Sequence, residues 1–486
     1  MASLQQLSPQ PLWQWFEQIC SIPHPSKHEA KLIEHIKAWV ETQPSVSIKQ
    51  DHVGNLILSK AATAGMENRK GVVLQAHLDM VPQKNNDKAH DFVTDPIETI
   101  IDGEWLTANG TTLGADNGIG MASALAVLGS DDIAHGPLEV LLTIDEEAGM
   151  TGAFGLQSDS LTGDILINTD SEQEGEIYMG CAGGIDASLT LDLDYQAVAS
   201  NSHHFTVNVS GLKGGHSGCD IHLGRGNANK LLARFLFNAP SDLNLALADI
   251  KGGSLRNAIP REGEIVFSVD AVQSNALQAY VAQFTQAVTQ ELALAEPNLS
   301  ITLKESNSAS QVMTADSQHR LVAMMHACPN GVIRMSNAIE GVVETSLNMG
   351  VVSVVDGKAT VLCLIRSLDD SSRNNVESML AAIASLAGGN ASFSGAYPGW
   401  KPDNSSPVMA LVREVYQQIF QREPDIMVIH AGLECGLFKK PYPDMDMVSI
   451  GPTIKFPHSP DEKVHIESVA QYWQLLVELL KSIPTK

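Results

Sequence analysis

The stretch GVVLQAHLDM, residues 71–80, decides the fold of this chain. An almost unbroken apolar run leads into His77 and Asp79, which is the pattern of a strand buried on both faces of a parallel sheet. Similar strand patterns follow at 138–145 (LEVLLTID) and 164–170 (DILINTD), and the helical pattern GIGMASALAVLG precedes the first of them. This alternation predicts an α/β sandwich with a mostly parallel central sheet.

The pattern of alternating apolar strands and helices gives way near residue 187 to strands with one polar face, and it returns near residue 396. Between these points the order strand, helix, hairpin, helix occurs twice. We therefore expect residues 187–395 to form an inserted α+β lid domain of two similar halves, with the strand LSITLKES opening the second half. The catalytic domain is then discontinuous, with residues 1–186 as its first part and 396–486 as its second. A chain of 486 residues also exceeds the roughly 250–300 at which a single core stops growing.

Composition narrows the classes of function. The formal net charge of -25 argues against nucleic acid, which needs a basic footprint, and against anionic membranes. The longest apolar stretches fall short of the ~18 residues of a membrane span, and the N-terminus lacks the pattern of a signal peptide. The expected location is therefore the cytoplasm. Six cysteines without a CxxC pair indicate buried thiols rather than a disulfide framework or a thiolate metal site.

Five candidate metal ligands stand after strand-like runs or just before a helix. They are His77, Asp116, Glu147, Asp170 and His458. The carboxyl ends of strands in an open α/β sheet share one edge, so residues distant in sequence converge there. Taken singly, each has an ordinary alternative: Asp116 could cap a helix, and His458, beside two prolines, could occupy a turn. Together, two imidazoles and three carboxylates suit zinc, manganese or cobalt.

The motifs around these residues resemble those of a two-zinc peptidase family that includes carnosinases, aminoacylases and aminoacyl-histidine dipeptidases. The matching motifs are AHLDMVP, GTTLGADNGIGMA, TIDEEAGMTGA, NTDSEQEGEIYMGCAGG, KFPHSPDE and, in the inserted domain, GGHSG and SLRNAIPRE. They cover nearly the full chain in the same order and are most similar to aminoacyl-histidine (cytosol non-specific) dipeptidases. Asn117 stands where many relatives have a second aspartate, and this change should leave the role of Asp116 intact.

The resemblance implies two zinc ions per chain, which cobalt or manganese could replace. His77 and Asp170 would bind one ion, Glu147 and His458 the other, and Asp116 would bridge the two. The expected reaction is the hydrolysis of Xaa-His and other unblocked dipeptides by a water shared between the ions.

Two further carboxylates receive roles from the same resemblance. Glu146 would act as the general base that takes the proton of the attacking water. Asp79 would orient His77 from outside the ligand shell, and the HxD spacing places both side chains on one strand face.

A second set of residues is expected to contact the substrate or the transition state: His216, Asn257, Arg366, Gly432 and Glu434. His216 resembles the lid histidine that donates to the oxyanion, although taken alone it would more often be a surface loop residue. Arg366 suits the free carboxylate of a dipeptide through a bidentate contact, and an exposed charge at a strand end is the equal alternative. Gly432 and Glu434 would contact the amine or backbone of the substrate.

Other functions stay open at this point. An N-acyl amino acid hydrolase or an aminopeptidase on longer peptides would use the same ligands. A catalytically inactive metal-binding protein is disfavoured by Glu146 and Asp79, since neither is needed merely to hold metal. The sequence contains no GxSxG setting for a serine nucleophile.

The expected partners are dipeptide substrates and a second copy of the chain. Exposed strand edges on the lid invite pairing into a homodimer. His216 would still serve its own chain, because the second lid half would take the place of a partner's lid.

Overall fold

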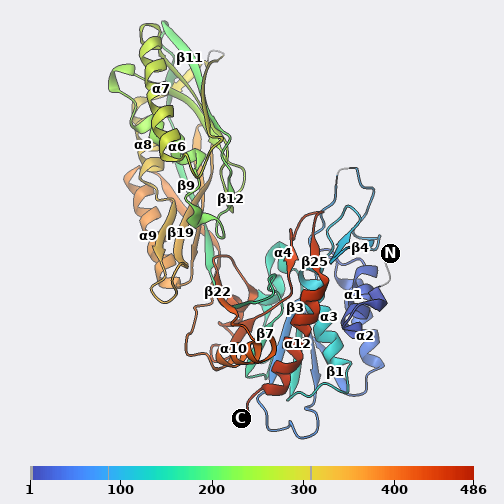
Figure 1. Cartoon of the computed structure of the whole chain (residues 1–486). Helices are drawn as coiled ribbons and strands as arrows, with labels where there is room; N and C mark the ends of the chain where they lie inside the picture. Colours follow the sequence, from blue (N-terminus) through green and yellow to red (C-terminus); the bar gives the residue numbers. More distant parts are fainter. Residues whose placement is uncertain (1–3, 86, 307–308) are drawn as a thin grey trace. The chain divides into compact units, whose positions relative to one another are not determined.

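The computed structural model describes residues 4–85, 87–306 and 309–486. It contains two compact units (Figure 1). The first comprises Met1–Gly180, Pro402–Val428 and Leu433–Lys486, and the second comprises Cys181–Lys401 and Ile429–Gly432. The second unit therefore begins before residue 187 and includes a short return segment that the sequence analysis had assigned to the catalytic domain.

An eight-stranded sheet forms the centre of the first unit. Its strands in spatial order are β1 (Val46–Gln50), β2 (Leu56–Lys60), β6 (Leu138–Thr143), β3 (Val72–His77), β7 (Ile165–Asn168), β23 (Asp446–Ser449), β8 (Glu176–Cys181) and β22 (Asp425–Ile429). The four central strands, from β6 to β23, run parallel, and antiparallel pairs flank them. Every residue of β3, β6 and β7 is buried, which explains their continuous apolar runs. The predicted α/β architecture with a parallel centre is confirmed.

Helices and a small sheet complete the first unit (Figure 1). The helices are η1 (Leu4–Gln6), α1 (Gln10–Ser21), α2 (Ala30–Glu41), α3 (Ala115–Leu128), α4 (Glu146–Gly149), α5 (Thr151–Gly155), α10 (Pro407–Phe420), α11 (Glu434–Phe438) and α12 (Ile466–Ser482). The small sheet has the order β24 (Ile454–Lys455), β25 (Lys463–His465), β5 (Trp105–Ala108) and β4 (Thr99–Asp102). Every residue of α3 except Asp116 is buried, so this helix is apolar all round. In contrast, α12 buries one stripe that includes Tyr472, Leu476 and Leu480.

The second unit contains one long sheet with helices on one face (Figure 1). Its strands in spatial order are β16 (Ser300–Glu305), β11 (Ser202–Ser210), β15 (Gly263–Asp270), β13 (Ala246–Gly252), β19 (Val343–Val355), β20 (Lys358–Ser367), β9 (Gly183–Asp192) and β21 (Asn390–Tyr397), and β18 (Gly331–Met335) pairs with β19. The helices are η2 (Ile221–Leu223), α6 (Ala228–Phe237), η3 (Ser241–Leu243), η4 (Ala271–Gln273), α7 (Ser274–Glu291), α8 (Ala315–Ala327) and α9 (Asp370–Leu386). Two short pairs, β10 (Tyr195–Ala197) with β17 (Gln311–Met313) and β12 (Gly215–His216) with β14 (Ala258–Ile259), lie outside the long sheet.

The two predicted halves of the lid are present in this sheet. One half has the order β11, α6, β13, β15, α7, β16, and the other has the same order of types in β9, α8, β19, β20, α9, β21. The second strands of the halves, β13 and β19, pair antiparallel at Gly252 and Val352 and join the halves into one sheet. This strand–helix–strand–strand–helix–strand unit is a common α+β motif.

The halves are nested rather than consecutive, which corrects the expectation drawn from the sequence. The strand LSITLKES does not open the second half, because β16 pairs with β11 and closes the first half. The second half begins earlier, with β9, and the first half is inserted between β9 and α8. Sequence order alone could not show this, since strand pairing is a tertiary property.

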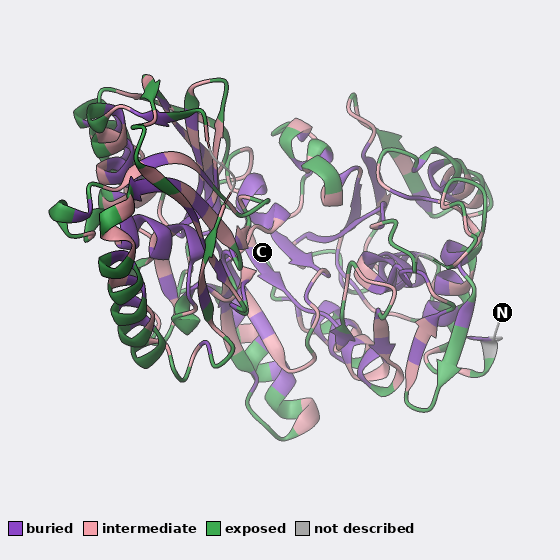
Figure 2. Cartoon of the chain, turned by 90° about the horizontal axis from the view of Figure 1, so that it is seen from above, coloured by how far each residue is buried: buried purple, intermediate pink, exposed green. Residues whose placement is uncertain are grey.

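Alternating burial along the strands of the lid sheet shows that one face of the sheet is covered. In β11, Phe205, Val207 and Val209 are buried while their neighbours are partly exposed, which is the pattern of a sheet with one covered face. These residues belong to a single apolar core that extends through both halves. Figure 2 shows buried residues gathered along the central strands of each unit.

In the part of the chain that the structure describes, every helix is too short or too polar to span a bilayer.

Candidate metal centre

The five expected ligands lie in the first unit, and three of them stand at the carboxyl ends of its parallel strands. His77 is the last residue of β3, Glu147 lies in α4 directly after β6, and Asp170 follows β7 by two residues. Asp116 is in the first turn of α3, and His458 lies in the loop between β24 and β25. Parallel strands bring their carboxyl ends to one edge, and this explains the convergence of His77, Glu147 and Asp170.

The side chains form two clusters that share Asp116. On one side, His77 Nε2 lies 3.1 Å from Asp116 Oδ1 and 3.4 Å from Asp170 Oδ1. On the other, His458 Nε2 lies 3.2 Å from Asp116 Oδ2 and 3.0 Å from Glu147 Oε2. The two oxygens of Asp116 therefore face different histidines, as a carboxylate between two cations would.

The donor atoms fit divalent cations. In each of the sets His77, Asp116, Asp170 and Asp116, Glu147, His458, one atom from every residue lies within 4.8 Å of the others. Buried oxygens of Glu147 and Asp170 have no hydrogen-bond partner among the described residues, and such orphaned atoms need a partner. A third set, His77, Glu146 and Glu147, also satisfies the spacing, so the geometry alone does not separate the two glutamates.

The electrostatics of the cluster also favour cations. Burial raises the pKa of Asp170 to about 7, and the charges of Asp116 and Glu147 contribute to the increase. Hydrogen bonds to Asp116 and Glu147 raise the pKa of His458 to about 11. Burial lowers the pKa of His77, but the charge of Asp170 and the hydrogen bonds with neighbouring carboxylates together outweigh it and leave that pKa well above its ordinary value. The crowded carboxylates thus retain protons that bound divalent ions would displace.

Asp79 lies beside His77, and its carboxylate has further partners. It lies beyond the end of β3, and His77 Nδ1 is 2.9 Å from its main-chain oxygen but 3.6 Å from its carboxylate. The carboxylate also accepts hydrogen bonds from Ser26 Oγ at 2.7 Å and from the backbone N–H groups of Glu146 at 2.9 Å and Glu147 at 3.2 Å. One residue therefore orients the histidine through its backbone and the two glutamates through its side chain.

Glu434 is buried in the first unit. Its Oε2 accepts hydrogen bonds from Gln75 Nε2 at 2.6 Å and Thr143 Oγ1 at 2.8 Å, while its Oε1 has no partner among the described residues. Burial raises the pKa of Glu434 to about 8, and the charge of Asp170 adds to the effect. Gln75 was missed by the sequence analysis, although a polar residue within an apolar strand is a recognisable signal.

The second unit holds the other predicted residues. The buried Arg366 has Nη1 donating to Tyr397 Oη at 3.0 Å, Nη2 at 3.3 Å from His216 Nε2, and Nε at 3.4 Å from Ser217 Oγ. Burial and the charge of Arg366 lower the pKa of His216 to about 4, so this imidazole is neutral near pH 7. Asn257 borders the cluster, since its main-chain oxygen accepts from the N–H of Ser217.

Gly432 also belongs to the second unit, in its return segment. Tyr397 was missed by the sequence analysis, and no motif around it points to Arg366.

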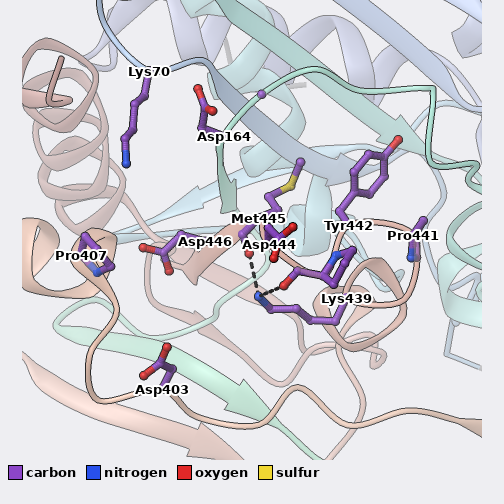
Figure 3. A pocket seen from close by; sticks show the side chains of 12 residues that line it. Lys70, Asp164, Asp403, Pro407, Lys439, Pro441, Tyr442, Asp444, Met445 and Asp446 are labelled. Atoms are coloured by element: carbon purple, nitrogen blue, oxygen red, sulfur yellow. Dashed lines mark hydrogen bonds between the residues drawn. The ribbon is translucent and has the colours of Figure 1, made fainter. Parts of the chain in front are cut away.

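A separate hollow of about 600 Å³ opens at the amino ends of the strands (Figure 3). None of the predicted site residues lines it. Its charged groups bind the chain itself: Lys439 Nζ donates to the main-chain oxygen of Met445 at 2.7 Å, and Asp446 accepts from Ser406 Oγ at 2.6 Å. This hollow is therefore not part of the metal cluster, which lies at the carboxyl ends.

Comparisons with known proteins bear on this centre. The model for peptidase family M20/M25/M40 matches residues 73–482. The chain is 59% identical, over 100% of both sequences, to the cytosol non-specific dipeptidase of Escherichia coli (strain K12). It matches the crystal structure of aminoacylhistidine dipeptidase from Vibrio alginolyticus with a TM-score of 0.93 and 58% identity, covering 100% of this chain and 99% of that one. Aminopeptidase PepT from Bacillus cereus, with 17% identity, a TM-score of 0.61 and coverage of 98% and 99%, shares the fold.

Proposed function

This chain belongs to peptidase family M20/M25/M40, and on that basis we propose that it hydrolyses unblocked dipeptides, Xaa-His among them, at a centre of two zinc ions. The observation that carries the proposal is the pair of ligand clusters that share Asp116. The dipeptidases of Escherichia coli and Vibrio alginolyticus, which are similar over the whole chain, support the substrate class.

The ligand assignment follows the distances. His77 and Asp170 would hold one ion, Glu147 and His458 the other, and Asp116 both, because its oxygens face opposite histidines. Nitrogen and carboxylate ligands without thiolate suit zinc, and we expect cobalt or manganese to replace it. When bound, a pair of such ions supplies Lewis acidity and lowers the pKa of a water at the site.

Glu146 is the proposed general base. Burial raises the pKa of Glu146 well above its ordinary value, and the negative charges of Asp170 and Glu434 add to this effect. A carboxyl group with a raised pKa can accept a proton from water and return it to the leaving amine. Its backbone is fixed by the hydrogen bond from its N–H to Asp79 at 2.9 Å, which restricts where the side chain can reach.

Four of the proposed substrate contacts belong to the second unit, and Glu434 belongs to the first. Arg366 would bind the terminal carboxylate of the dipeptide, because this buried guanidinium contacts the uncharged groups of Ser217, Tyr397 and His216. His216, whose Nε2 lies 3.3 Å from Arg366 Nη2, would stabilise the developing oxyanion, as the resemblance of its motif implies. Asn257 and Gly432 would add backbone contacts, and Glu434 would face the substrate amine.

A single panel of substrates tests the proposal. The protein is stripped with a chelator and then assayed with and without added zinc on a Xaa-His dipeptide, a tripeptide and an N-acetyl amino acid. We expect zinc-dependent hydrolysis of the dipeptide far above that of the other two. Preference for the tripeptide would indicate an aminopeptidase, preference for the acetylated substrate an N-acyl amino acid hydrolase, and absence of turnover by metal-loaded protein an inactive metal-binding protein.

We also propose a cytoplasmic homodimer that associates through the lid. The Escherichia coli relative is a cytosolic dipeptidase, and the second unit contains an edge strand, β18, with exposed Val332, Ile333 and Met335. His216 would act within its own chain, because each chain holds two lid halves. Mixing His216→Ala with Glu146→Ala tests this arrangement. Recovery of activity after verified subunit exchange would show that His216 works across the interface.

A further inference from the structure

Glu462 occupies an unusual position beside the metal cluster. It is 2% exposed and lies four residues after His458. Its Oε2 accepts the backbone N–H groups of Leu113 at 2.8 Å and Gly114 at 3.0 Å. Its Oε1 accepts those of Ala115 at 2.8 Å and Asp116 at 3.3 Å. One buried carboxylate therefore binds four consecutive N–H groups that end at the shared ligand Asp116.

These four donors form an anion site that the chain fills with its own side chain. Gly114 is left-handed, with a φ of 73°, and the following residues begin α3. Backbone N–H groups that converge at such a turn and at a helix N-terminus favour a negative charge. Hydrogen bonds to an ionised acceptor are about twice as strong as neutral ones, so a carboxylate holds this loop more firmly than an amide would.

The backbone of Glu462 is itself anchored. Its N–H donates to the main-chain oxygen of Ser459 at 3.0 Å, and its main-chain oxygen accepts from Thr107 Oγ1 at 2.8 Å. The preceding loop is strained, because Phe456 and His458 are non-glycine residues with φ values of 56° and 59°. Such conformations persist only when the surroundings over-determine them.

Glu462 thus links the loop that carries Asp116 to the loop that carries His458. We propose that Glu462 is a positioning residue that sets the spacing of these two ligands and thereby the affinity for the second cation, the one assigned to Glu147 and His458. The distance between Asp116 Oδ2 and His458 Nε2 is 3.2 Å. The inference rests on the proposed metal centre. Under the simpler reading, Glu462 only caps α3 and contributes stability without acting on the metal.

Glu139 provides a matched control for the test. It is 9% exposed and accepts the backbone N–H groups of Thr162 and Gly163, both at 2.8 Å. It lies near the amino end of β6, whereas the ligands follow the carboxyl end. Glu139→Gln therefore removes the same kind of loop anchor without touching a loop that carries a ligand.

The experiment measures cobalt and zinc binding to metal-stripped wild type, Glu462→Gln, Glu462→Asp and Glu139→Gln. A chromophoric chelator gives both dissociation constants, the absorption of bound cobalt reports its geometry, and thermal unfolding of metal-free protein reports stability. In Glu462→Gln an amide nitrogen faces two of the N–H donors, so we expect a 10–100-fold weaker second site and an altered cobalt spectrum. Glu462→Asp keeps the charge and should recover part of the affinity.

The control separates positioning from stability. Glu139→Gln should lower the unfolding temperature of the metal-free protein and leave both dissociation constants unchanged. If Glu462→Gln behaves in the same way, with wild-type affinities and spectrum, Glu462 is only a cap and the inference is overturned. If the wild type itself binds no second ion, the proposed two-metal centre fails, and this outcome is distinguished from the former by the wild-type titration alone.

Discussion

Glu146 and Glu147 are adjacent residues for which we predict different effects of substitution by glutamine: loss of turnover at Glu146 and loss of a metal ion at Glu147. Both begin α4, and both backbone N–H groups bind the carboxylate of Asp79. Glutamine has nearly the same shape as glutamate and leaves these backbone bonds in place. The substitution therefore removes either a proton acceptor or a charged ligand, with little change in the fold.

The expected magnitudes follow from what each side chain contacts. Glu146→Gln cannot accept a proton, so kcat should fall by about 10²–10⁴-fold, which corresponds to roughly 3–5 kcal/mol of transition-state stabilisation. Glu147 Oε2 lies 3.0 Å from His458 Nε2 in one ligand set. Glu147→Gln should therefore weaken one metal site by more than the roughly 10–100-fold that loss of an outer partner costs.

Two measurements on each variant separate the roles. Metal content after gel filtration should be two ions per chain for Glu146→Gln and about one for Glu147→Gln, as the binuclear proposal requires. Dipeptide hydrolysis should stay low in Glu146→Gln at any zinc concentration, whereas excess zinc should restore part of the rate in Glu147→Gln. Because His77, Glu146 and Glu147 also form a possible ligand set, Glu146 could itself bind metal. A Glu146→Gln protein that loses one ion but turns over well per loaded site would refute our assignment.

Three further outcomes are expected. Exhaustive chelation should abolish hydrolysis and lower the unfolding temperature, zinc should restore both, and full activity in chelator would contradict a metal-dependent reaction. Gly120→Ala should weaken metal binding and lower the free energy of unfolding by about 1–3 kcal/mol. The reason is that the added Cβ would lie 2.7 Å from the main-chain oxygen of Thr169, the residue next to Asp170. A metal-binding titration and denaturant unfolding measure the two effects. Burial and the charge of Arg366 lower the pKa of His430 to about 3. Between about pH 6.5 and 3, the unfolded state therefore binds one more proton at this histidine than the folded state does. The free energy of unfolding should decrease by roughly 1.4 kcal/mol for each unit by which the pH is lowered in this range. Denaturant unfolding of His430→Gln should lack this slope, and parallel curves for variant and wild type would contradict it.

The fold of the first unit could be predicted from sequence because its signal is local. Residues 72–77 are all buried, and a strand buried on both faces must be apolar along its whole length. The clustering of His77, Glu147 and Asp170 was predictable for a related reason, since polar residues directly after such strands meet at one edge of the sheet. His77 and Asp170 follow this rule without any knowledge of their partners.

The nesting of the lid halves could not be predicted in this way. Strands β9 and β16 carry ordinary alternating patterns, and nothing in either stretch specifies its neighbour. Pairing of β16 with β11 joins segments that are far apart in sequence, and the hydrophobic period gives the face of a strand but not its partner.

The sequence by itself determined the apolar strands, the polar residues that end them and the excess of negative charge. Only the tertiary structure decided which groups those polar side chains bind. Asp79 was expected to orient His77, and the sequence did not show that its carboxylate also accepts the backbone N–H groups of two glutamates. Glu462 was part of a quoted motif but received no role, because its four partners are backbone N–H groups 346–349 positions away. Every non-proline residue carries such a donor, so no side-chain pattern can mark which of them a buried carboxylate will bind.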